Sequence, residues 1–229
     1  GEGRDVLRGT LCLADASCRS RIRLALTLWY EANARTFPWR QTNAWGRYVS
    51  EIMLQQTQTT TVIPYFEAFM KRFPDPSSLA QASDDKVLKA WEGLGFYRRA
   101  RNLQAAAQAM VELHEGEVPY DYASLRSLPG VGDYTAGALA SFLSNARTPA
   151  IDGNVWRVML RILALDLKQG KSADKKLIEN YLKLLLEHDR EEVEVEAALI
   201  NEALIELGAG ICRPKSQALC EICPWQEFC

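Results

Sequence analysis

Four cysteines crowd the last 18 residues of the chain in the pattern C-x7-C-x2-C-x5-C, namely Cys212, Cys220, Cys223 and Cys229. A structural zinc site usually has two short C-x2-C knuckles, and only one is present here. Four thiolates at uneven spacing are more typical of the ligands of an iron–sulfur cluster. The clustering therefore indicates metal ligation in a reducing compartment rather than a disulfide framework. Cys12 and Cys18, near the other end of the chain, are expected to be free thiols or disordered.

The segment LPGVG, residues 128–132, forms a turn between two predicted helices and could bind a phosphate. Gly130 and Gly132 let the backbone turn sharply and leave its N–H groups uncovered. The N-terminus of the following helix adds the positive end of its dipole. Together they would make a small anion site suited to a DNA phosphate. A plain helix–helix connection is the alternative, but the whole string favours a helix-hairpin-helix unit.

Two carboxylates are candidates for chemistry: Glu51 in VSEIMLQQTQ and Asp152 in PAIDGNVWRV. Glu51 lies on an otherwise apolar predicted helix, and Gln55 and Gln56 follow one turn later with amides that can bond base edges. Asp152 directly precedes another predicted helix, where an Asp commonly caps the first turn. Capping is compatible with chemistry because a cap is held rigidly. The alternatives are a surface glutamate at position 51 and a purely structural cap at position 152.

The composition is that of an ordinary globular protein. The 229 residues are 48% hydrophobic and 24% charged. A net charge of −2 counts mildly against a nucleic-acid partner, but basic residues gather locally in RRAR at 98–101 and at Arg157 and Arg161. A local patch with backbone amides can still hold DNA. The acidic stretch 187–196 is predicted to be a solvated loop and helix start, and no apolar run approaches the roughly 20 residues of a membrane span.

Apolar residues recur at helical spacing along the chain, and no segment alternates as a strand would. We predict an all-α fold of two helical lobes with a cleft between them. A six-helix domain with the hairpin would span 43–150, a cluster domain 21–42 plus 151–229, and a partly disordered extension 1–20. Gln56 would share a helical face with Val49 and Met53, and Pro64 would stand in the first turn of the next helix.

Five strings, in order along the chain, resemble MutY-type adenine DNA glycosylases: SEIMLQQTQ, GLGFYRRARNL, LPGVGDYTAGA, IDGNVWRV and NEALIELGA, followed by the terminal cysteines. These enzymes belong to the helix-hairpin-helix superfamily that includes endonuclease III. The resemblance implies a base-excision repair enzyme that flips out adenine mispaired with 8-oxoguanine or guanine and hydrolyses its N-glycosidic bond. It also implies a 4Fe–4S cofactor held by the four clustered cysteines. The implied partner is double-stranded DNA with an adenine mispair, bound by a monomer with no membrane association.

The resemblance assigns the catalytic roles. Glu51 matches the general acid that protonates the adenine, and Asp152 matches the carboxylate that stabilises positive charge on the sugar. Asn154 and Tyr134 match residues that support that charge centre. Such chemistry needs one carboxyl kept protonated and another kept ionised, and burial among apolar neighbours would keep Glu51 protonated.

Tyr134 distinguishes branches of the superfamily. Bifunctional relatives carry a lysine at this position, which attacks the sugar as an amine and cleaves the strand. A phenol cannot form that Schiff base. The resemblance therefore implies base removal without efficient strand cleavage.

The resemblance also implies a set of DNA contacts. Gln56 matches the side chain inserted into the gap that the flipped base leaves, and Phe96 stands where the family usually has a tyrosine beside 8-oxoguanine. The missing hydroxyl removes one hydrogen bond, worth roughly 0.5–1.5 kcal/mol, so we expect insertion to survive and lesion discrimination to weaken. The full predicted set is Trp39, Arg40, Gln55, Gln56, Thr57, Phe96, Tyr97, Gly130, Val131, Gly132, Glu202 and Ile205.

Four members of this set would border the adenine: Trp39 and Arg40 from FPWR, and Glu202 and Ile205 from NEALIE. Their alternatives are a core tryptophan, a surface ion pair, a solvated glutamate and a packed isoleucine. The first cysteine gap has seven residues where the family has six, which alters the loop RPKSQAL and its DNA contacts.

Family members commonly carry a further C-terminal domain that reads 8-oxoguanine, and this chain stops at its last cluster cysteine. Preference for 8-oxoguanine should then rest on the contacts that remain. The alternatives to an adenine glycosylase are a thymine-mismatch glycosylase of the same fold, a non-catalytic DNA-binding iron–sulfur protein, and a zinc-stapled scaffold. We expect a nucleoid-associated cytoplasmic location in a bacterium, or a nuclear or mitochondrial one in a eukaryote.

Overall fold

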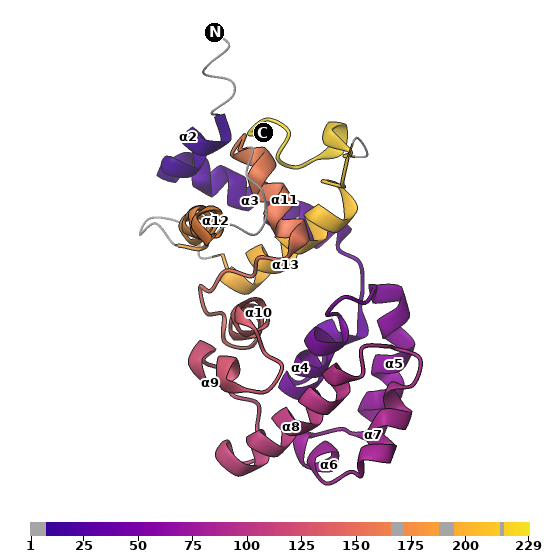
Figure 1. The fold of residues 1–229 in the computed structure, drawn as a ribbon. Helices are drawn as coiled ribbons and strands as arrows, with labels where there is room; N and C mark the ends of the chain where they lie inside the picture. Colours follow the sequence, from indigo (N-terminus) through magenta and orange to yellow (C-terminus); the bar gives the residue numbers. More distant parts are fainter. Residues whose placement is uncertain (1–7, 166–171, 188–194, 216–217) are drawn as a thin grey trace. The chain divides into compact units, whose positions relative to one another are not determined.

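The computed structural model describes residues 8–165, 172–187, 195–215 and 218–229, and these residues form helices and loops with no strand (Figure 1). The all-α prediction is confirmed. The chain divides into two compact units. Residues 36–144 form the continuous unit, and residues 1–35 with 145–229 form the discontinuous unit. No helix in the described ranges is long and apolar enough to cross a membrane.

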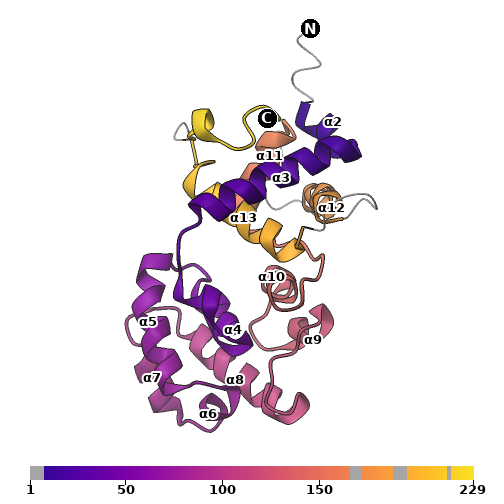
Figure 2. The ribbon, with the colours of Figure 1, turned by 180° about the vertical axis from the view of Figure 1, so that it is seen from behind.

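The continuous unit is built around one central helix, α4. Its helices are η1 (Pro38–Gln41), α4 (Ala44–Met53), α5 (Thr59–Arg72), α6 (Pro76–Ala80), α7 (Asp84–Trp91), α8 (Arg98–Leu113), α9 (Tyr122–Ser127) and α10 (Asp133–Ser144). α4 packs against α5, α8 and α10 (Figures 1 and 2). Trp45, Tyr48, Val49 and Ile52 are buried at the spacing of one helical face, and this face explains why α4 occupies the middle of the unit.

The discontinuous unit joins the two ends of the chain. It contains α2 (Arg8–Ala14), α3 (Ala16–Asn33), α11 (Gly153–Ile162), α12 (Ser172–Leu186), α13 (Ala197–Gly210) and η2 (Cys220–Ile222). α13 packs against both α3 and α11. Trp225 and Phe228, from the cysteine-rich segment, are buried in the same core, and the Trp225 indole donates to the Ile22 carbonyl at 3.0 Å. The cysteine-rich segment is thereby anchored to α3.

Two local predictions about the continuous unit were wrong. α5 begins at Thr59 instead of Pro64, so the proline lies inside the helix. The carbonyl of Thr60 that loses its helical donor lies on an exposed residue, where water can replace the bond. Gln56 does not share the apolar face of α4, because that helix ends at Met53 and Gln56 follows with a φ of 57°.

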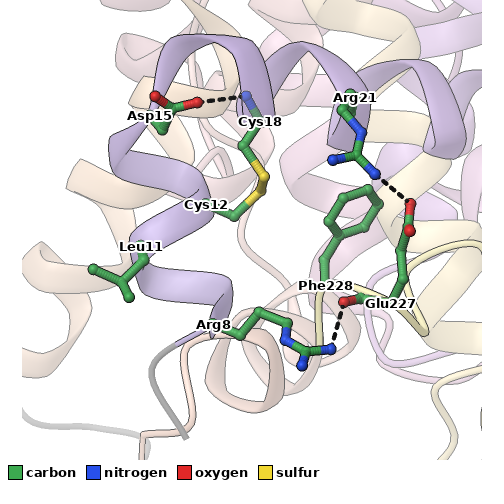
Figure 3. Close-up of a pocket in the computed structure, with 8 residues that line it drawn as sticks. All are labelled: Arg8, Leu11, Cys12, Asp15, Cys18, Arg21, Glu227 and Phe228. Atoms are coloured by element: carbon green, nitrogen blue, oxygen red, sulfur yellow. Dashed lines mark hydrogen bonds and ion pairs between the residues drawn. A yellow bond between two sulfur atoms is a disulfide. The ribbon is translucent and has the colours of Figure 1, made fainter. Parts of the chain in front are cut away.

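The expectation for Cys12 and Cys18 was also wrong, since the two form a disulfide with their Cα atoms 5.0 Å apart. α2 turns directly into α3, whose N-cap Asp15 accepts a hydrogen bond from the Cys18 backbone N–H at 2.8 Å. This tight corner brings the cysteines together (Figure 3). Within the predicted extension 1–20, the described residues form α2 and the beginning of α3, joined at Asp15, and Leu13 is buried in the core. Of the acidic stretch 187–196, residues 188–194 lie outside the described residues.

Candidate active site

The four predicted catalytic residues are divided between the two units. Glu51 on α4 and Tyr134 on α10 belong to the continuous unit, where these two helices pack together. Asp152 and Asn154 stand at the start of α11 in the discontinuous unit. Each unit therefore carries one of the predicted carboxylates and one of the predicted supporting side chains.

Glu51 is buried, with only 6% of its surface exposed, which excludes the surface-glutamate alternative. Its Oε1 lies 3.8 Å from Nε of Arg47, one turn earlier on α4. The Arg47 guanidinium stacks 4.0 Å from the ring centroid of Phe142. A buried carboxylate is commonly accompanied by a cation. Arg47 was missed by the sequence reasoning, although its spacing of four residues from Glu51 was visible there.

Asp152 is the N-cap of α11, as predicted. Its Oδ1 accepts from the Val155 backbone N–H at 2.8 Å, and its Oδ2 accepts from the Asn154 side-chain amide at 3.0 Å. Burial raises the pKa of Asp152, while these hydrogen bonds and the charge of Arg157 act in the opposite direction. The carboxylate is thus desolvated and held by two donors in a fixed position.

Arg157 fixes the orientation of Asn154. Its Nη2 donates to Asn154 Oδ1 at 2.9 Å and to the Gly208 carbonyl at 2.7 Å, and its Nε donates to the Cys212 carbonyl at 2.8 Å. A Cβ at Gly208 would lie 2.6 Å from the Asn154 Cβ, so only glycine allows α13 to approach α11 this closely. Hydrogen bonds therefore run from the carbonyl of Cys212 through Arg157 and Asn154 to Asp152.

The basic pair Arg157 and Arg161 is engaged with the cysteine-rich segment. Nη1 of Arg161 lies 3.3 Å from Cys212 Sγ and 2.7 Å from the Arg213 carbonyl, and its Nη2 donates to the Lys215 carbonyl at 3.1 Å. The local basic character read from the sequence thus corresponds to helix α11 holding the loop that follows Cys212.

The predicted helix-hairpin-helix is present as α9, the turn 128–132 and α10. Gly130 has a φ of 79°, and a Cβ there would lie 2.7 Å from the Asn102 Cβ, so this glycine is required by the fold. A Cβ at Gly132 would meet no atom within 4 Å. The space next to Gly132 is open, whereas Val131 between the glycines is buried.

Other side chains brace this hairpin. Gln55 Nε2 contacts Thr135 Oγ1 at 3.2 Å and the Gly130 carbonyl at 3.5 Å, so Gln55 is bonded to protein instead of reaching outward. Asp133, the first residue of α10, accepts from Arg126 Nε at 2.8 Å. Neither contact was predicted from the sequence, because both join residues from different elements.

Gln56 and Phe96 protrude from two loops of the continuous unit. Both are non-glycine residues in the left-handed region, with φ of 57° and 49°, and Phe96 is 60% exposed. Such conformations cost about 1–3 kcal/mol each and concentrate at functional sites. Tyr97 is also exposed, and the Thr57 hydroxyl accepts from Arg99 Nη2 at 3.0 Å.

Trp39 lies in the core of the continuous unit. It is 4% exposed, stacks on Phe37 with ring centroids 5.0 Å apart and meets Phe66 edge-on at 5.6 Å. The guanidinium group of Arg40 lies over the ring of Phe37, 5.0 Å from its centroid. This packing matches the core alternative for Trp39.

Glu202 and Ile205 both lie on α13 in the discontinuous unit. Glu202 Oε2 accepts from the Tyr30 hydroxyl at 2.7 Å, so this side chain is bonded and is not simply solvated. Ile205 is half-buried against the core of the unit.

The four clustered cysteines are free thiols in the structure. Burial raises the pKa of Cys223 to about 11, and the charges of the other three sulfurs act in the same direction. Within the described ranges, no group of three or more His, Cys, Asp or Glu side chains is arranged to hold a metal ion. Four thiols without a disulfide are the number and type of ligand that an iron–sulfur cluster with four thiolate ligands requires.

An open pocket of about 410 Å³ lies beside the disulfide, and none of its lining residues belongs to the predicted site (Figure 3). Arg8 Nη1 donates to the Glu227 carbonyl at 3.0 Å, and Arg21 Nη2 bonds the Glu227 carboxylate at 3.2 Å. The Arg21 guanidinium also covers the Phe228 ring at 5.3 Å. These contacts tie the end of the cysteine-rich segment to α2 and α3.

A family model described as "HhH-GPD superfamily base excision DNA repair protein" matches residues 49–187. Curated relatives include the adenine DNA glycosylase of Buchnera aphidicola, 39% identical over 205 residues that cover 88% of this chain and 55% of that protein. The adenine DNA glycosylase of Homo sapiens is 37% identical over 217 residues, which cover 90% of this chain and 38% of that protein. The chain thus spans about half of the first relative and less of the second.

Solved structures share the fold. A thermostable thymine-DNA glycosylase is 23% identical with a TM-score of 0.80, over 94% of this chain and 97% of that one. A non-covalent endonuclease III–DNA complex is 21% identical with a TM-score of 0.71, over 92% and 94% of the two chains.

Proposed function

Because the chain belongs to the HhH-GPD superfamily of base excision DNA repair proteins, we propose that it is a monofunctional DNA glycosylase. It removes adenine mispaired with 8-oxoguanine or guanine from double-stranded DNA. The observation that carries the proposal is the Asp152 assembly, a desolvated carboxylate held by the Val155 N–H and the Asn154 amide. The naming of the curated relatives supports adenine as the base.

Asp152 would stabilise the sugar as the glycosidic bond breaks. A fixed negative charge in a desolvated site acts strongly on positive charge that develops in the transition state. Because Arg157 and Asn154 hold Asp152 in place, no reorganisation is needed at the moment of reaction. The carboxylate must be ionised for this role.

Glu51 would donate the proton to the leaving adenine. Glu51 is buried, and its Oε1 lies 3.8 Å from Nε of Arg47. In this role the carboxyl group gives up a proton during base release and takes one back from water between turnovers. Arg47 is therefore part of the environment of the proposed acid.

With Tyr134 in this position, the reaction would stop after the base is removed, without cleavage of the DNA strand. Tyr134 is half-buried at the start of α10, directly after the hairpin turn. A phenol offers no amine for a Schiff base with the sugar, so water is the attacking nucleophile.

The hairpin would bind the DNA backbone through its amides, because the space beside Gly132 is open to a phosphate. Gln56 and Phe96 would enter the duplex where adenine leaves it, which compensates the cost of unstacking. Both side chains are already held in protruding loops.

The four clustered cysteines, Cys212, Cys220, Cys223 and Cys229, would hold a 4Fe–4S cluster. When bound, such a cluster would cross-link the cysteine-rich segment, and it supplies no group to the hydrolysis. Arg157 and Arg161 hold the beginning of this segment through carbonyl groups. Iron and sulfide analysis of the purified protein tests this assignment, and zinc in place of iron would contradict it.

Single-turnover base release tests the function. We expect release from duplexes with adenine opposite 8-oxoguanine or guanine, and none from duplexes with thymine at that position. Glu51→Gln should abolish release while leaving duplex affinity nearly unchanged. The matched control is Glu67→Gln, an exposed glutamate on α5 of the same unit, which should behave as wild type. Turnover by Glu51→Gln would remove Glu51 as the acid, and release of thymine alone would indicate the thymine-mismatch alternative.

Borohydride trapping tests the monofunctional assignment. The wild type should form no covalent complex with DNA, since it lacks an amine at position 134. Tyr134→Lys introduces one and should give trapped complex, whereas Tyr134→Phe should not. Efficient trapping of the wild type would contradict the assignment.

A further inference from the structure

Arg99, in the first turn of α8, is an arginine buried to 8% exposure that caps the end of another helix. Its Nη1 donates to the carbonyls of Met53 at 2.7 Å and Ile52 at 3.3 Å, and also to that of Gln55. These carbonyls stand at the C-terminus of α4, where helical donors run out. Arg99 therefore completes the hydrogen bonding of α4 from a neighbouring element.

The other side of the guanidinium binds a second loop. Nη2 donates to the Thr57 hydroxyl at 3.0 Å, to the Gly95 carbonyl at 3.3 Å and to the Leu94 carbonyl at 3.4 Å. The guanidinium carbon also lies 5.4 Å from the ring centroid of Phe96. One side chain thus joins residues 52–57 to residues 94–96.

The electrostatic setting explains why a cation occupies this position. Arg99 lies at the positive end of its own helix, but its charge reaches the negative end of α4, where a cation is favourable. None of its hydrogen-bond partners in the described ranges is a carboxylate, and burial lowers the pKa of Arg99. The planar guanidinium can serve several carbonyls in one plane, which an ammonium group cannot do.

Each of the two joined loops carries one strained, exposed residue. Gln56 follows the carbonyls that Arg99 caps, and Phe96 follows the carbonyls of the second loop. A left-handed conformation at a non-glycine residue persists only when the surrounding structure holds it. Arg99 contacts both loops and can therefore hold both conformations at once.

We propose that Arg99 is a positioning residue that couples Gln56 to Phe96, so that the two side chains enter the duplex as one preformed unit. The entry into DNA rests on the proposed function. The coupling of the two loops is a property of the free protein and can be tested without DNA.

Hydrogen exchange of the free protein tests the coupling. Arg99→Lys keeps the positive charge but loses the planar donors, so exchange should rise at least about tenfold in residues 54–57 and 94–97 together. A change in only one segment, or in neither, would overturn the proposal.

The matched control is Arg23→Lys in the discontinuous unit. Arg23 is 2% exposed and likewise caps a helix, since it donates to the α12 carbonyls of Leu185 at 2.7 Å and Leu184 at 3.0 Å. Loss of this second buried arginine should leave exchange in 54–57 and 94–97 as in the wild type. Equal acceleration by Arg23→Lys would mean that Arg99 contributes only general stability.

A double-mutant cycle in single-turnover base release tests the consequence for DNA. In the wild-type background, the combined effect of Gln56→Ala and Phe96→Ala should differ from the product of the single effects by at least about threefold. In the Arg99→Lys background the two effects should multiply independently. The same coupling in both backgrounds would refute the role of Arg99. If the wild type releases no adenine, the proposed function fails, while the exchange experiment still decides the coupling.

Discussion

Asp152→Asn would separate the charge of this residue from its capping role. Asparagine caps a helix about as well as aspartate, so the bond from the Val155 N–H can be kept. The second oxygen, however, accepts from Asn154, whose own oxygen is held by Arg157 at 2.9 Å. An asparagine that keeps the cap would turn its NH₂ group toward the NH₂ group of Asn154, and that hydrogen bond is lost.

The expected effects on stability and on catalysis differ in size. The lost hydrogen bond costs about 0.5–1.5 kcal/mol, and this cost is partly offset because a desolvated charge is removed. Unfolding at neutral pH should therefore change little. Loss of one preorganised electrostatic group typically slows a reaction about 10²–10³-fold. Base release by Asp152→Asn should fall by that order.

The pH dependence gives a second readout. Burial raises the pKa of Asp152 in the folded protein above its value in the unfolded chain, so ionisation of this group lowers the stability of the folded state. This loss of stability is absent at a pH below the unfolded pKa and complete at a pH above the folded pKa. The variant has no such cost. Its melting temperature relative to wild type should therefore improve from about pH 3.5 to pH 7.

The measurements are the single-turnover rate of base release and the melting temperature, each for wild type and variant at about pH 3.5 and pH 7. Wild-type base release should also decline on the acid side as Asp152 becomes protonated. A variant that releases adenine at the wild-type rate would show that Asp152 is only a cap. A relative melting temperature that falls with rising pH would contradict the assignment of the raised pKa.

Three further substitutions test other parts of the structure. Gly132→Ala adds a Cβ that meets nothing within 4 Å, so the melting temperature should hold while duplex affinity falls; unchanged affinity would argue against a phosphate there. Gly208→Ala places a Cβ 2.6 Å from that of Asn154 and should cost about 1–3 kcal/mol in urea unfolding and slow base release; wild-type values for both would contradict the close packing. Cys18→Ser removes the disulfide to Cys12 and should cost about 2 kcal/mol; reductant should lower wild-type stability to the same level, and a persistent difference under reductant would point to another cause.

The elements that the sequence predicted correctly depend on local interactions. The cap at Asp152 is a contact over three residues, and the hairpin follows from glycines directly between two helical patterns. The four C-terminal cysteines are free thiols, which agrees with the prediction that they do not form a disulfide framework. Signals of this kind involve only a few neighbouring residues, so they can be recognised from the sequence alone.

Two missed roles, those of Arg99 and Arg157, have a common cause in contacts that local patterns do not contain. Arg99 caps a helix that ends 46 residues earlier in the chain, and Arg157 bonds a carbonyl 55 residues later. Each looked in sequence like an ordinary basic residue. Their partners are chosen by the packing of whole helices, which is not encoded in any short window.

The sequence alone determined the types of groups available: two carboxylates, a phenol at position 134, a glycine turn and four clustered cysteines. Tertiary structure decided whether these groups are buried and what they bond. It buried Glu51 beside Arg47, desolvated Asp152 while Arg157 and Asn154 held it, and joined Cys12 to Cys18. The physical reason is that side-chain identity is covalent, whereas burial and long-range hydrogen bonds exist only once helices distant in the chain have packed together.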